Sequence, residues 1–385
     1  MVVRTQRALL GDQLVEDAVV ELSETHEITV VRPGRAGDPP ALRGLLVPGL
    51  VNAHLHLELS WARGAIEGGE GLPAWVQALR SCTPPPDAAG RARRAAEAMI
   101  EGGTALVCDV SNLGDTAELL ASVGLAGIVQ HELLGLSQAG LSERIEAARA
   151  PARWVGKVAV RPSPHATYSA PGPLLAAAGA GRAGVPGSVH LAEDPGEAEL
   201  TLRGSGPFAE LLDALGIDWR WWEPPGLSPT AWLAALGLLG PELLLVHGVH
   251  LEPTDRAAIA AAGAWVCLCP RSNQHIGGQL PDVPALMQAG IGLCLGTDSL
   301  GSAPDLDVLG EIALLCGAFP QIPALRWLQL ATVGGADALQ RPGLGRIAVG
   351  ATPGLLLLEV DHPRALRRVP PRRWLVRPPT EGGAP

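Results

Sequence analysis

The sequence predicts an α/β fold: a (β/α)8 barrel of the TIM type joined to a small β-sandwich domain built from both termini. In the middle of the chain, eight apolar segments with the pattern of strands alternate with helical segments. Histidine or aspartate follows several of these strands, where barrels of this type carry their active-site residues. We therefore expect residues 1–46 plus 345–385 to form the β domain and residues 47–344 to form the barrel.

Strand-like segments at both ends of the chain supply the small β domain. Residues 17–22 and 27–31 are short segments of strand pattern near the N-terminus, and residues 354–360 form an apolar segment near the other end. The last residues are rich in arginine and proline and are expected to be loop. Because these strands flank the long alternating region, we expect them to assemble into one small domain.

The barrel strands are predicted from their apolar composition. Most of them are apolar throughout, as expected for parallel strands that are buried on both faces. Helical segments lie between them, for example residues 88–101, 142–150 and 253–262. Eight strand–helix units favour a closed barrel over an open doubly wound sheet. The predicted strands are residues 44–53, 104–110, 124–130, 158–161, 188–191, 243–247, 264–268 and 291–296.

Composition and charge exclude several classes of protein. The net charge is −10 and Lys157 is the single lysine, so the chain lacks the clustered basic surface that a nucleic-acid polymer needs. No signal-peptide pattern is evident. The most apolar stretch, residues 232–249, is interrupted by glycine, proline and glutamate and is no membrane span. None of the six cysteines forms a CxxC pair, so we expect buried thiols and a cytoplasmic location.

Polar side chains stand at the ends of four predicted strands. The first strand ends in His54 and His56, whose spacing directs both imidazoles to the same side. Taken singly, such histidines are usually structural, and an aspartate after a strand is often a helix cap. Imidazoles and a carboxylate gathered at several strand exits suit catalytic zinc or iron. The other members of the set are His190 with Glu193, His247 and Asp298.

Four segments at these strand ends resemble the amidohydrolase superfamily. They are PGLVNAHLH at residues 48–56, VHLAE at 189–193, VHGVH at 246–250 and LGTDS at 295–299. The resemblance covers nearly the whole chain and implies one divalent metal ion, zinc or iron. Members with two metals carry a carboxylated lysine at the end of strand four, whereas Lys157 lies at its start and is expected to be solvated. The implied metal ligands are His54, His56, His190 and Asp298.

Further segments look like the aminodeoxyfutalosine deaminases of menaquinone biosynthesis, which belong to a mononuclear branch that deaminates purine-type rings. The segment SPHATYS at residues 163–169 resembles a substrate-contacting loop of the S-adenosylhomocysteine deaminases, except that Thr167 stands where that family often has proline. The segments that carry the narrower resemblance are HLHLELS at residues 54–60, LPAW at 72–75, GSGPF at 204–208, CPRSN at 269–273 and GTDSL at 296–300.

The resemblance implies hydrolytic deamination of an aminated purine nucleoside, a small-molecule substrate. Asp298 would accept a proton from water, Glu193 would protonate the ring nitrogen, and His247 would position the nucleophile. Because both carboxylates shuttle protons, their environments should push their pKa values apart. The implied substrate contacts are His165 for the base, Glu58 for the ribose, Trp75 for an aromatic ring, Arg271 for an aryl carboxylate, and Asn273.

Alternatives stay open for several of these residues and for the activity. Glu58 could pair with Arg63, Trp75 could belong to the core, and Ser272–Asn273 could form a structural turn. The enzyme could deaminate another ring, such as adenosine derivatives, guanine, pterin or cytosine. It could instead release chloride or an alkylamine from a triazine, or the barrel could bind a ligand without catalysis. The resemblance alone suggests a homodimer.

Overall fold

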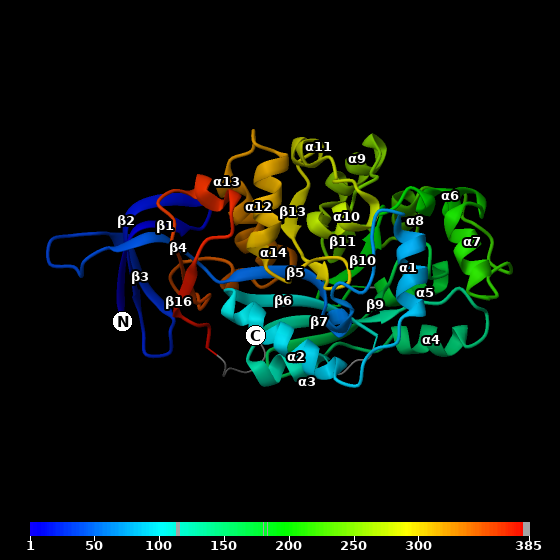
Figure 1. Ribbon diagram of the computed structural model, residues 1–385, viewed down its shortest axis with the longest axis horizontal. Helices are drawn as coiled ribbons and strands as arrows, with labels where there is room; N and C mark the ends of the chain where they lie inside the picture. The colour runs from blue at the N-terminus through cyan, green and yellow to red at the C-terminus, as the bar shows by residue number, and fades with distance from the viewer. Residues whose placement is uncertain (113–115, 180, 183, 380–385) are drawn as a thin grey trace.

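The computed structural model describes residues 1–112, 116–179, 181–182 and 184–379. Strands from both termini form one six-stranded sheet at one end of the molecule (Figure 1). Its order is β16-β15-β4-β1-β2-β3, so the described strands form a single sheet instead of the two facing sheets of the expected sandwich. The strands are β1 (Val2–Leu10), β2 (Gln13–Leu22), β3 (Ile28–Pro33), β4 (Leu42–Val47), β15 (Leu355–Leu358) and β16 (Arg372–Val376).

One predicted strand, residues 44–53, is two strands that belong to different sheets. The chain leaves β4 at Pro48, which cannot donate to a ladder, and enters β5 (Leu50–His56). Gly49 fits between them because a Cβ atom there would lie 2.4 Å from the Cβ atom of Ala105. This break lets β4 pair with the terminal strands while β5 pairs with β6.

The central strands form two sheets whose neighbours are parallel, apart from the short antiparallel β8. One sheet has the order β14-β5-β6-β7-β9-β8 and the other has the order β10-β11-β12-β13. A parallel bridge between Ala166 and His190 joins the sheets on one side. On the other side the chain passes from β13 directly into β14, which pairs with β5.

Seven of the eight predicted strand segments are confirmed as single strands with small shifts at their ends, and the eighth, residues 44–53, is divided between β4 and β5. The short hairpin strand β8 was not expected from the sequence. The bounds are β6 (Thr104–Ser111), β7 (Ala126–Leu133), β8 (Arg153–Val155), β9 (Val158–Pro164), β10 (Gly187–Leu191), β11 (Leu243–His247), β12 (Trp265–Leu268), β13 (Gly292–Leu295) and β14 (Asp298–Ser299).

Helices surround these strands, and their ends follow local sequence signals. In α9 (Pro253–Ala262), the Glu252 and Asp255 side chains form a capping box and Gly263 ends the helix with a φ of 68°. The predicted helices at residues 88–101 and 253–262 are confirmed, and the one at 142–150 lies at Leu141–Ala148. The described helices besides α9 are α1 (Leu72–Ser81), α2 (Ala88–Glu101), α3 (Thr116–Val123), α4 (Leu141–Ala148), α5 (Gly172–Gly179), α6 (Gly196–Arg203), α7 (Pro207–Ala214), α8 (Pro229–Ala235), α10 (Pro270–Gly277), α11 (Val283–Gln288), α12 (Val308–Ala318), α13 (Ala324–Gln329) and α14 (Gly335–Ala338). Short helical turns are η1 (Leu57–Ala62), η2 (Leu330–Gly334), η3 (Pro342–Leu344) and η4 (Pro363–Arg367).

The core lies on both sides of the central strands. Leu245, Val266 and Leu293 pack with helical residues such as Ile312 and Trp327 in one buried cluster. A second cluster is made of smaller residues, including Cys108, Cys267 and Cys294, whose thiols are free as expected. Among the described residues, no helix combines the length and apolar character that crossing a bilayer requires.

Candidate metal centre and active site

The polar residues at the strand ends converge in the folded chain. His54 and His56 end β5, His190 lies in β10 with Glu193 just beyond it, and His247 ends β11. The positive φ angles of His247 (77°) and Asp298 (58°) place both residues in the left-handed region, which non-glycine residues rarely adopt. Such strain persists only where the surrounding structure holds it, and it is typical of functional sites.

Three histidines and one carboxylate form the predicted ligand set. The Nε2 atoms of His54 and His56 each lie 3.5 Å from Asp298 Oδ1. The Nε2 atoms of His56 and His190 are 3.3 Å apart. All four residues are buried, and the ring nitrogens of His54 have no hydrogen-bond partner among the described residues. Because buried polar atoms are normally satisfied, this donor set fits a metal ion.

His190 has only one ring nitrogen available to coordinate a metal ion, which favours a site with a single ion. Its Nδ1 atom donates a hydrogen bond to the carbonyl oxygen of His165 (2.8 Å), which leaves Nε2 as the coordinating atom. Lys157 comes just before β9, and its Nζ atom donates to the Pro379 carbonyl oxygen (2.7 Å), so it is half-buried instead of fully solvated. Imidazole and carboxylate ligands suit a divalent ion such as zinc or iron, and these four residues would hold a single one.

Two serines fix the Asp298 carboxylate, and sequence reasoning had named Ser272 but missed Ser302. Ser272 and Ser302 donate hydrogen bonds to Asp298 Oδ2 over 2.5 and 2.8 Å. Burial opposes a charge on Asp298, but His54 and the other nearby imidazoles outweigh it and hold the pKa of this carboxyl well below its ordinary range. Asp298 therefore stays ionised next to the histidines.

Glu193 and His247 form a second pair beside this cluster. Glu193 Oε2 lies 3.3 Å from His247 Nε2, and His247 Nδ1 lies 2.9 Å from the side-chain amide of Asn273. Because that amide donates, His247 Nδ1 accepts and Nε2 carries the hydrogen that points toward Glu193. Burial, together with the Asp298 charge, raises the pKa of Glu193 well above its ordinary value. The two carboxyl pKa values thus diverge in the expected direction.

The loop that carries Glu193 is held by a buried carboxylate. Glu197 accepts hydrogen bonds from the backbone N–H groups of Ala192 (2.9 Å) and Glu193 (2.8 Å). Ala192 has a φ of 52°, so this turn is strained and needs such support. Burial raises the pKa of Glu197 to about 7.

A cavity of about 560 Å³ opens above the cluster and is lined by His56, His190 and the other site residues. Of the predicted substrate contacts, Glu58, Trp75 and His165 line it. Asn273 lies behind His247 and lines a smaller adjoining cavity of about 170 Å³. The apolar wall of the main cavity consists of Leu72, Val76, Leu79, Leu211, Leu212, Leu215 and Ile217.

Arg271 is not placed as the sequence suggested. It lies at the start of α10, where its guanidinium is 2.6 Å from Glu311 and 2.8 Å from Asp305, and only 11% of its side chain is exposed. Because both acids already satisfy it, Arg271 braces α10 against α12 and does not line the cavity. The expectation that it meets a substrate carboxylate is corrected accordingly.

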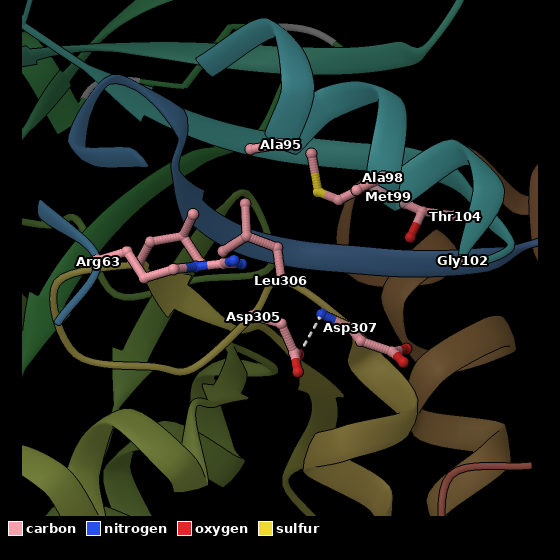
Figure 2. Close-up of a pocket in the computed structure, with 10 residues that line it drawn as sticks. Arg63, Ala95, Ala98, Met99, Gly102, Thr104, Asp305, Leu306 and Asp307 are labelled. Carbon is pink, nitrogen blue, oxygen red and sulfur yellow. Dashed lines mark hydrogen bonds between the residues drawn. The ribbon is translucent and has the colours of Figure 1, made fainter. Parts of the chain in front are cut away.

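Glu58 is held by its own neighbourhood and not by Arg63. It accepts hydrogen bonds from the Ser111 hydroxyl (2.8 Å) and from the backbone and side chain of Asn112 (2.9 and 3.1 Å). Arg63 instead lines a separate cavity of about 190 Å³. Figure 2 shows this cavity between α2 and the loop at Asp305 and Asp307, and no histidine is among the residues that line it.

Glu132 is a further site residue that sequence reasoning missed. It lies in β7, lines the main cavity, and accepts a hydrogen bond from the Asn112 side chain (3.0 Å). Burial raises its pKa to about 7. Gln130 and Glu132 are polar residues at i and i+2 near a strand end, the same pattern that revealed His54 and His56, so a signal was present.

Comparisons with known proteins agree with this geometry. The model of the Amidohydrolase family matches residues 45–380. A 5-methylthioadenosine/S-adenosylhomocysteine deaminase of Halobacterium salinarum is 30% identical over 376 residues, covering 92% of this chain and 81% of that protein. An aminodeoxyfutalosine deaminase of Deinococcus radiodurans is 30% identical over 332 residues, covering 81% of this chain and 75% of that protein.

The fold is also found in solved structures. The structure of an atrazine chlorohydrolase from Arthrobacter aurescens, complexed with zinc, superposes with a TM-score of 0.77 and 19% identity, covering 99% of this chain and 96% of the other. The chain therefore belongs to the amidohydrolase family. Within that family it is a metal-dependent hydrolytic deaminase.

Proposed function

We propose that this enzyme deaminates a 6-aminopurine nucleoside and that aminodeoxyfutalosine is its preferred substrate. The observation that carries the deamination is the buried Glu193–His247 pair, 3.3 Å apart, beside the ionised Asp298. Relatives that are 30% identical include deaminases of methylthioadenosine, S-adenosylhomocysteine and aminodeoxyfutalosine, so the purine amine is their shared chemistry. We also propose that the two parallel sheets form one closed (β/α)8 barrel over residues 47–344.

The residues divide the proton transfers between them. When bound to His54, His56, His190 and Asp298, a divalent metal ion lowers the pKa of water from 15.7 toward about 7. Asp298 accepts the proton of the attacking water, and His247 Nε2–H, which faces Glu193 in this structure, would turn its hydrogen bond to the attacking oxygen and orient it. Glu193, protonated because of its raised pKa, gives its proton to the ring nitrogen. Water adds at C6, the amine takes up the proton held by Asp298 and leaves as ammonia, and the added hydroxyl group returns its proton to Glu193 as it becomes the oxo group of the product.

The shape of the cavity supports a substrate with an apolar, anionic substituent. Its apolar wall comes from α1, from α7 and from the residues just after α7, and the two helices pack against each other. Arg80 at the end of α1 is the one arginine or lysine among the described lining residues. It is exposed and has no ion pair within the part of the chain that the structure describes. An aryl carboxylate would place its ring on the apolar wall and its charge at Arg80.

A direct assay tests this proposal. Metal-loaded protein is supplied separately with aminodeoxyfutalosine, adenosine, 5-methylthioadenosine and S-adenosylhomocysteine, and ammonia release is followed with the adenine-to-hypoxanthine absorbance change. We expect the highest kcat/KM for aminodeoxyfutalosine. A higher value for another nucleoside would overturn the substrate but keep the deaminase. If no aminated purine or pyrimidine releases ammonia, substrate deamination itself is refuted and other leaving groups become the leading account.

A further inference from the structure

One buried carboxylate in the cavity has an oxygen with no partner. Glu132 is only 6% exposed, and its Oε2 atom accepts a hydrogen bond from the Asn112 side chain (3.0 Å). Its Oε1 atom has no hydrogen-bond partner among the described residues and lies 3.8 Å from both His165 Nε2 and His190 Nδ1. Buried acceptors are normally satisfied, so this oxygen is placed to meet a ligand.

The corner of the cavity formed by Glu132 and His165 is not a second metal site. His190 Nδ1 donates to the His165 carbonyl oxygen and therefore has no lone pair to offer. Without it, Glu132 and His165 supply only two ligands, fewer than the three or more protein ligands of ordinary zinc sites. The unsatisfied oxygen therefore calls for a hydrogen-bond donor on a bound molecule.

His165 presents a second acceptor next to it. The Ser169 hydroxyl donates to the Ala166 carbonyl oxygen (3.2 Å), so it accepts from His165 Nδ1–H over 2.6 Å. His165 Nε2 consequently carries a lone pair toward the cavity. Two acceptors 3.8 Å apart match two neighbouring donors, and vicinal hydroxyl groups provide such a pair.

The position of the corner identifies those hydroxyls. Glu193, His247 and Asp298 follow β10, β11 and β13, whereas Glu132 lies in β7 and His165 follows β9. The reacting edge of the purine ring must face Glu193, His247 and Asp298. The corner formed by Glu132 and His165 therefore lies beside a part of the nucleoside other than that edge. The Glu58 carboxylate, which binds Asn112, fixes the amide that holds Glu132. We propose that Glu132 Oε1 and His165 Nε2 accept the 2′- and 3′-hydroxyl groups of the nucleoside, an inference that rests on the proposed function.

Deoxynucleosides provide the test. Hydrogen bonds to charged groups contribute about 1.5–3 kcal/mol, so metal-loaded enzyme should deaminate adenosine about 10- to 100-fold better in kcat/KM than 2′-deoxyadenosine or 3′-deoxyadenosine. In Glu132→Ala and Glu132→Gln, kcat/KM for adenosine should fall, and its ratio to the deoxynucleoside that lacks the hydroxyl group facing Glu132 should approach one, while the ratio to the other deoxynucleoside, whose missing hydroxyl group faces His165, should persist. Metal content and thermal unfolding are measured on each variant, and Glu143→Gln, an exposed carboxylate on α4, is the matched control.

The outcomes separate the two ideas. If both Glu132 variants bind metal and deaminate nucleosides with the ribose preference of the unchanged enzyme, the inference is wrong and the proposed function stands. If the unchanged enzyme treats ribo- and deoxynucleosides alike, the inference is also wrong. If no nucleoside is deaminated by the metal-loaded enzyme, the proposed function fails and takes the inference with it.

Discussion

His247 Nε2 lies 3.3 Å from Glu193 Oε2, with both side chains almost fully buried. The other ring nitrogen of His247 accepts a hydrogen bond from Asn273, so the imidazole presents a donor to this carboxyl group and not a lone pair to the metal. This relationship separates the two halves of the site. In the site that we propose, His54, His56 and His190 hold the metal ion, and His247 serves the chemistry.

Glu193→Gln should remove catalysis while leaving the metal centre intact. The amide keeps the size and hydrogen-bonding capacity of the carboxyl group but cannot transfer a proton, and general acid–base groups contribute about 10²–10⁴-fold in rate. We expect kcat to fall at least by that factor with an unchanged metal content, measured by ammonia release and metal analysis. Near-normal turnover would refute the assigned role.

Asn273→Leu should impair turnover without loss of metal. The substitution removes the donor that sets the tautomer of His247, whose Nε2–H then no longer points reliably at the reacting water. Residues that orient catalytic groups in this way typically contribute about 10–100-fold. A loss of bound metal in this variant would instead show that His247 is a metal ligand.

One equivalent of zinc or iron should bind per chain. The fully buried His54 has no other hydrogen-bond partner, so His54→Ala should abolish metal binding, and a chelator should remove activity that added divalent ion restores. Metal analysis of well-loaded protein provides the measurement. Two equivalents per chain would contradict the mononuclear site.

Arg80→Ala should change substrate preference and little else. Arg80 is exposed at the mouth of the cavity, so its loss should not alter unfolding. We expect KM for aminodeoxyfutalosine to rise about tenfold, as for one charged hydrogen bond, while kcat/KM for uncharged adenosine stays the same. An equal loss for both nucleosides would assign Arg80 a general role.

Arg271→Ala should act on stability instead. Removing this side chain leaves Glu311, which is 0% exposed, as an uncompensated buried charge, and breaking such pairs costs about 3–5 kcal/mol. Urea unfolding should show that loss, and the Arg80→Ala protein is the matched control. If the Arg271 variant keeps full stability but no longer prefers anionic substrates, the original sequence-based role is restored.

The sequence by itself determined the strands and predicted the metal ligands, because both depend on local order. Continuous apolar segments specify buried parallel strands, and the spacing of His54 and His56 on one strand fixes their common direction. Asp298 could be found in the same way, since it directly follows an apolar strand. Pro48–Gly49 also indicates a break between β4 and β5, but the sequence does not say that the two strands pair with different sheets.

Only the tertiary structure decided which other side chains reach the cavity. Arg271 follows a strand end as the ligands do, yet Glu311, forty positions away, binds it and withdraws it from the site. Arg80 carries no distinctive motif and enters the cavity because α1 is packed beside it, whereas Glu132 has the i, i+2 polar pattern of a strand end, which did not by itself say what the side chain would meet. Ion pairing and the packing of distant segments are not encoded by the spacing of neighbouring residues, so the lining of the site emerges only when the chain has folded.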